Sequence, residues 1–182
     1  MKGYYYLITQ FPMLTFGEKP SLKKEDFLSE ASKWLSQERM DILISADINN
    51  FYPQPNDPQI LKNYRSFEMA LRLDLVDYRR VEKTEREYKP KEAKYKYIEE
   101  KGDSPLGIEK KLLFKRWQRI EEEERGHYFD FSFLIAYYLK LQILERLFTF
   151  DKETGRKKFN DICRVVVKGT KEVDEALLSK II

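Results

Sequence analysis

The sequence predicts an all-α fold, an irregular multi-helix bundle in a single domain that spans residues 1–182. The chain has 182 residues, 42% of them hydrophobic, which is enough for one sizeable core but not for two independent domains. Glycine and proline are scarce, with seven of each. Between them the apolar residues recur mainly at steps of three and four, the spacing of an amphipathic helix.

The N-terminus departs from this pattern. Residues 4–8 are aromatic and β-favouring, and Pro12 pushes the residue before it towards extended geometry. We therefore expect a short extended N-terminal segment, followed by a loop at Gly17 and Pro20.

Local start signals place the first helices. Ser21 is the expected N-cap of one helix, and a shorter helix is expected over residues 38–48. Asp57 and Ser104 each precede a proline, which is a strong start signal because the first turn of a helix does not need the missing N–H. The helix after Asp57 is expected to run beyond Val81.

Two further signals bound the most apolar helix. Gly126 indicates the end of the helix that starts at Ser104, and Asp130 is the expected cap of a helix over residues 131–150. That helix is apolar nearly all round, which predicts that it is the central element of the bundle. Shorter amphipathic helices are expected at residues 159–166 and 173–181.

Residues 79–103 form the most highly charged part of the chain. From Arg79 to Lys101, 15 of 23 residues are charged. The pattern predicts a solvated, protruding hairpin or loop inserted in the domain. The alternative is an arm that contacts a partner through tyrosines such as Tyr88 and Tyr95.

Two charged residues stand where the helical period expects apolar ones. Lys140 lies outside the polar strip of its helix, and Asp74 projects from the expected apolar face of the helix that follows Asp57. An unpaired charge in a core costs several kcal/mol. We expect Asp74 and Lys140 to form a buried ion pair, or each to meet a polar group on a neighbouring helix.

Three arginines spaced seven apart are expected on the exposed side of the helix that carries Asp74. They are Arg65, Arg72 and Arg79. Glu68 is placed to pair with Arg72 at i, i+4. These arginines are therefore candidates for a surface that contacts a partner.

The scarcity of cysteine and histidine excludes most enzyme chemistries. Cys163 is the one cysteine and His127 the one histidine, so neither an internal disulfide nor a Cys/His zinc site can form. Glu124 and His127 have the Glu-x-x-His spacing of di-iron bundles, but those sites need the motif twice. Phosphate-binding glycine loops do not occur. We predict no catalytic residue, no metal and no cofactor, and interpret His127 as a loop or interface residue.

Charge and hydropathy bear on partners and location. The net charge is +3 and the basic residues are not concentrated in one segment, which argues against nucleic-acid binding. The N-terminus lacks the pattern of a signal peptide, and no apolar run reaches the roughly 18–20 residues of a membrane span. A cytoplasmic protein without direct membrane insertion is expected, and any association with a membrane is expected to be peripheral, through a complex.

Two stretches carry a resemblance to known proteins. One is residues 4–14 (YYYLITQFPML) with residues 16–20 (FGEKP), and the other runs from residues 127–131 (HYFDF) through 137–146 (YYLKLQILER) to Gly155 and Phe159. They resemble an uncharacterised bacterial family encoded beside V-type ATPase genes. The second stretch is also distantly similar to the C/d subunit of those enzymes. The resemblance implies a non-catalytic protein that works with a rotary ATPase.

The leading functional hypothesis is an accessory or central-stalk-associated subunit of a V-type ATPase, with no enzyme activity of its own and with protein subunits as partners. The alternatives are a free-standing helical adaptor without an ATPase connection and, less favoured, an RNA-binding protein. The residues assigned to the candidate partner surface are aromatic or basic: Tyr4, Tyr5, Tyr6, Arg65, Arg72, Arg79, Tyr88, Tyr95 and His127.

Overall fold

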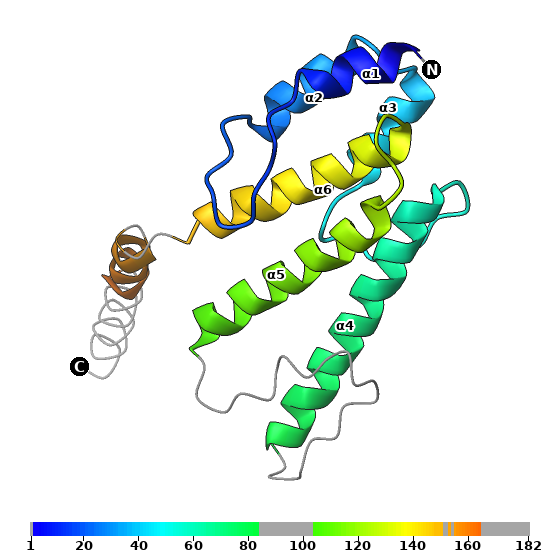
Figure 1. The fold of residues 1–182 in the computed structure, drawn as a ribbon. Coiled ribbons are helices and arrows are strands. Elements are labelled where there is room, and N and C mark those ends of the chain that lie inside the picture. Colours follow the sequence, from blue (N-terminus) through cyan, green and yellow to red (C-terminus); the bar gives the residue numbers. More distant parts are fainter. Residues whose placement is uncertain (1, 84–103, 151–152, 154, 165–182) are drawn as a thin grey trace, which may run out of the picture. The chain divides into compact units, whose positions relative to one another are not determined.

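The computed structural model describes residues 2–83, 104–150, 153 and 155–164 (Figure 1). Within these residues the regular structure is helical and contains no strand, which confirms the all-α prediction. The helices are α1 (Lys2–Thr9), α2 (Lys24–Ser32), α3 (Gln37–Ser45), α4 (Gln59–Lys83), α5 (Pro105–Glu124) and α6 (Phe131–Phe148), and residues 155–164 are helical as well.

The contacts between Cα atoms divide the chain into two compact units. The first is Met1–Leu147 and the second is Phe148–Ile182. The first unit holds the core and all the sites described below. That residues 1–182 form a single domain stays a prediction.

The N-terminal segment is a helix, so the predicted extended segment is wrong. In α1, Leu7 and Ile8 are buried while Tyr5 and Tyr6 are exposed, and Tyr4 is partly buried. Positions 4, 7 and 8 share one face of a helix but not of a strand. Packing of that face against the rest of the unit therefore overrides the β preference of the aromatic residues.

Most of the predicted helix ends are confirmed, because the residues that set them act locally. The Ser104 Oγ accepts a hydrogen bond from the Gly107 N–H at 3.1 Å at the start of α5. Gly126 has a φ of 90° just after α5, and the Asp130 Oδ1 accepts from the Phe133 N–H at 3.0 Å in α6. Ser21 is the exception, because α2 begins later and its N-cap is Lys23.

Removal of the Ser104 cap is expected to cost stability. Because Ser104→Ala leaves the Gly107 N–H without its acceptor, we expect a loss of about 1 kcal/mol in the free energy of unfolding. Urea denaturation followed by circular dichroism measures it. Ser36 is a matched control, since it is the N-cap of α3 but its side chain makes no capping bond. Equal losses for Ser104→Ala and Ser36→Ala would contradict the capping role.

Helix α6 is the central element of the first unit, as predicted. Its residues from Leu134 to Leu141 are all buried. Phe27 of α2 stacks on Tyr137 and Tyr138, with ring centroids 5.3 and 5.5 Å apart, and the Tyr137 hydroxyl donates to the Pro12 carbonyl at 2.8 Å. Figure 1 shows α1 and α2 along one side of α6, with α4 and α5 on the other. Tertiary packing around α6 therefore sets the position of each site.

The charged segment lies mostly outside the described residues. Helix α4 continues to Lys83, so residues 79–83 belong to that helix. The predicted arm or hairpin over 84–103, with Tyr88 and Tyr95, falls outside the described residues. In the part of the chain that is described, none of the helices has the length and hydropathy of a membrane-spanning segment.

Candidate partner-binding surface

Three aromatic side chains from two distant segments form an exposed cluster on the first unit. Tyr5 and Tyr6 belong to α1, and Phe129 lies between α5 and α6. The ring of Tyr5 lies 5.7 Å from that of Tyr6 and 4.9 Å from that of Phe129, measured between centroids. All three remain about half exposed, at 51%, 59% and 50%. We refer to Tyr5, Tyr6 and Phe129 as the aromatic cluster.

A groove of about 620 Å³ lies between the segment that follows α1 and the ends of α5 and α6. Its apolar wall comes from Phe11 to Leu14, and Tyr128, the neighbour of Phe129 in sequence, also lines it. Met13 and Tyr128 are exposed at 94% and 69%. Exposed aromatic and methionine side chains around a groove are typical of protein-binding surfaces.

Charged side chains also line the groove. Lys140 of α6 forms an ion pair with Glu124 at the end of α5, and its ammonium lies 5.2 Å from the centroid of the Trp117 ring. His127 Nδ1 lies 2.5 Å from Asp130 Oδ2. Lys140 therefore meets a polar group on a neighbouring helix. The alternative prediction of a direct pair between Lys140 and Asp74 is wrong; Asp74 is buried on α4 as expected.

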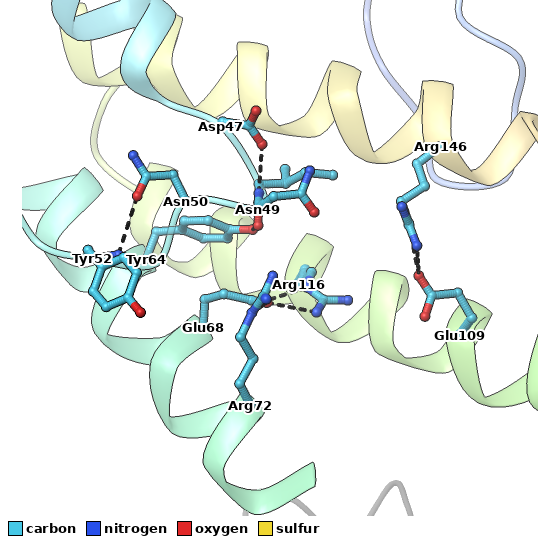
Figure 2. Close-up of polar contacts among 11 residues, drawn as sticks. Asp47, Asn49, Asn50, Tyr52, Tyr64, Glu68, Arg72, Glu109, Arg116 and Arg146 are labelled. Atoms are coloured by element: carbon cyan, nitrogen blue, oxygen red, sulfur yellow. Dashed lines mark hydrogen bonds and ion pairs between the residues drawn. The ribbon is translucent and has the colours of Figure 1, made fainter. Parts of the chain in front are cut away.

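A second polar centre joins α4 to α5 (Figure 2). The carboxylate of Glu68 is fully buried and accepts hydrogen bonds from Arg116 Nε and Nη2 at 2.7 and 2.8 Å. It also accepts from Arg72 Nε at 2.7 Å, which confirms the predicted i, i+4 pair. Bonding to this carboxylate raises the pKa of Arg116 against the opposing effect of burial. Arg116 therefore stays charged beside Glu68.

Arg65 is buried, so its assignment to the partner surface is wrong. Its side chain is 0% exposed. The Nη1 atom donates to both oxygens of Asp57 at 2.8 and 2.6 Å, and Nη2 donates to the Ser45 carbonyl at 2.7 Å. Arg65 thus fixes the segment between α3 and α4 against α4.

A cavity of about 470 Å³ opens beside Glu68, between α4 and α5. Four arginines line it: Arg72, Arg79, Arg116 and Arg146. Arg146 of α6 pairs with Glu109 of α5 through Nε and Nη2, at 2.9 and 2.8 Å. Figure 2 shows these two residues to one side of the Glu68 centre. We refer to this space as the arginine-lined cavity.

The structure separates the predicted surface residues into groups. Tyr5 and Tyr6 are exposed in the aromatic cluster, with Tyr4 partly buried beside them. Arg72 and Arg79 line the arginine-lined cavity, and His127 lines the groove. Tyr88 and Tyr95 fall outside the described residues, and Arg65 is buried. The predicted residues that remain accessible are thus divided among three places on the first unit: the aromatic cluster, the arginine-lined cavity and the groove.

Sequence reasoning missed Phe129 and Arg116. Phe129 belongs to the aromatic cluster but is separated from Tyr5 by more than a hundred residues, and Arg116 binds Glu68 across two helices. A signal for Phe129 existed in the aromatic run from Tyr128 to Phe131. No sequence signal indicated Arg116, because a lone arginine on an amphipathic helix is usually at the surface.

Comparison with known proteins gives one match. Residues 94–170 match a protein family described as a protein of unknown function (DUF2764). The matched range covers less than half of the chain and includes α5, α6 and residues 155–164. No curated protein and no solved structure matches the chain.

Proposed function

We propose that this protein is a non-catalytic accessory or central-stalk-associated subunit of a V-type ATPase, acting on the cytoplasmic side by binding other protein subunits. The observation that carries the binding role is the aromatic cluster. Aromatic side chains supply much of the binding energy in protein interfaces. The packing of the fold does not require the three rings of this cluster to be half exposed to water.

The location of the cluster links it to the resemblance. Tyr5 and Tyr6 lie in the first of the two resembling stretches, and Phe129 lies in the second. The structure brings these stretches together through the contact between Tyr5 and Phe129. The residues that carry the resemblance are thus the ones that form the exposed surface, which supports a binding role for that surface.

The arrangement of the arginines bears on the alternative of RNA binding. Arg65 is buried against Asp57, and Arg72 is engaged by Glu68. Arg65 therefore cannot contact a nucleic-acid backbone, and Arg72 lines a cavity and not an open basic face that could follow such a backbone. A helical adaptor without an ATPase connection remains the second candidate, since the aromatic cluster would serve it equally well.

A pull-down from the protein's own cells tests the proposal. We expect the tagged wild-type protein to recover V-type ATPase subunits, identified by mass spectrometry. We expect the double substitution Tyr5→Ser and Phe129→Ser to reduce that recovery at least tenfold, because the aromatic surface is lost while no buried group is removed.

Tyr52 provides the matched control. It is 66% exposed, and its ring lies 4.4 Å from that of Phe51 between α3 and α4, so Tyr52→Ser removes an exposed aromatic ring elsewhere. We expect this variant to recover the same subunits as the wild type. Recovery of other proteins without any ATPase subunit would favour the adaptor, and an equal loss for both variants would exclude a specific role of the cluster.

A further inference from the structure

We infer that the arginine-lined cavity is a binding site for a small molecule that carries a phosphate or polyphosphate group. Its volume of about 470 Å³ lies within the range of small-molecule sites. Among the described residues, the charged side chains that line it are four arginines and one glutamate, Glu109. The inference is independent of the proposed subunit role.

The charges in and behind the cavity do not cancel. Glu68 neutralises one positive charge, although it contacts both Arg72 and Arg116, and Glu109 neutralises another by pairing with Arg146. The cavity therefore keeps an excess of two positive charges. Asp47, whose carboxylate accepts the Asn49 N–H at 2.7 Å, lies outside the lining.

Donor groups remain available on these arginines. Glu68 engages only Nε of Arg72, and it engages Nε and Nη2 of Arg116. Arg79 is exposed and makes no hydrogen bond or ion pair with any residue of the described part of the chain. A guanidinium presents five N–H donors in a planar fork, so these three residues leave several donors for a ligand.

The way in which the arginines are held in place favours a multivalent anion. The Glu68 carboxylate fixes Arg116 within the wall, and the Arg72 guanidinium carbon lies 4.4 Å from the centroid of the Phe51 ring. A carboxylate carries one negative charge, so it neutralises only one guanidinium even where it contacts two, as Glu68 does. Phosphate, with more charge and more acceptor oxygens, uses several guanidinium groups at once.

The remaining wall has room for an organic portion. Leu75 and Val76 of α4 face the cavity together with Leu112 and Leu113 of α5. Two of these, Leu112 and Leu113, are buried. A phosphate group among the arginines would place the rest of a small ligand against these leucines and Val76.

Calorimetric titration of the full-length protein with inorganic pyrophosphate and with adenosine monophosphate tests the inference. We expect saturable binding of at least one of them, and at least tenfold weaker binding for Arg79→Glu. Arg80→Glu is the matched control, because Arg80 is the next residue of the same helix and does not line the cavity. It changes the net charge equally, and we expect its affinity to stay within twofold of the wild type.

Comparison of the two substitutions distinguishes a specific site from non-specific electrostatic attraction between an anion and a basic protein. Absence of saturable binding at millimolar ligand, or equal weakening by both substitutions, would overturn the inference. Citrate is titrated as a polycarboxylate of similar charge, and binding as tight as that of pyrophosphate would overturn the assignment to phosphate. Circular dichroism of both variants establishes that neither substitution unfolds the protein.

Discussion

Replacement of Glu68 with alanine is expected to lower the free energy of unfolding by about 3–5 kcal/mol. Glu68 is fully buried and is the acceptor for Arg116, which is itself buried. Without the carboxylate, the Arg116 guanidinium stays charged and loses its counter-ion, although its side chain is only 11% exposed. A domain of this size is stable by only about 5–15 kcal/mol, so the loss is a large part of the total. Urea denaturation at pH 7 measures it.

Two further variants separate the buried charge from ordinary surface effects. Glu122→Ala removes from α5 a carboxylate side chain that is 55% exposed. We expect this substitution to change the free energy of unfolding by no more than about 0.5 kcal/mol. Glu68→Leu combined with Arg116→Leu removes both buried charges, and we expect it to recover most of the stability that Glu68→Ala loses. A loss below about 1 kcal/mol for Glu68→Ala would contradict the buried pair.

Local features of the fold could be predicted from the sequence because neighbouring residues determine them. The cap at Ser104, the helix end before Gly126 and the cap at Asp130 each depend on a hydrogen bond or a backbone angle within three residues. The central position of α6 followed from an apolar surface on all sides, which only a surrounded helix can bury.

The orientation of α4 could not be predicted in the same way. Asp74, on its expected apolar face, is buried, as is Ile60. The buried face also includes Leu61, Tyr64 and Leu71 together with Arg65 and Glu68. Charged residues on a helix usually indicate its solvated face. Here they are buried because Asp57 and Arg116 supply opposite charges, and no local pattern indicates such partners.

The aromatic cluster likewise could be predicted only in part, because it joins residues that are far apart in the sequence. Tyr5 and Tyr6 could be proposed as binding residues from their composition alone. Their contact with Phe129 depends on α1 being helical and on its packing near the loop between α5 and α6. The β preference of tyrosine led to the wrong prediction for α1, because tertiary packing and not propensity determines the conformation of this segment.

Arg65→Ala is the second substitution with a large expected effect, a loss of about 3–5 kcal/mol in the free energy of unfolding. Arg65 is the counter-ion of Asp57, whose side chain is 3% exposed, and it also donates to the Ser45 carbonyl. Alanine would leave a buried carboxylate and a carbonyl without this donor. Arg65→Lys keeps the charge but not the fork of donors, so we expect an intermediate loss of about 1–3 kcal/mol.

Arg79 provides the comparison that makes this result decisive. It lies on the same helix and is exposed, so we expect Arg79→Ala to change stability by no more than about 0.5 kcal/mol. The regular spacing of Arg65, Arg72 and Arg79 predicted that all three would behave alike at the surface. Burial of Arg65 requires instead that its removal costs far more than that of the exposed Arg79, because it leaves the buried Asp57 carboxylate without its counter-ion. Equally small effects of Arg65→Ala and Arg79→Ala would indicate that Arg65 is exposed, and would contradict its buried ion pair with Asp57.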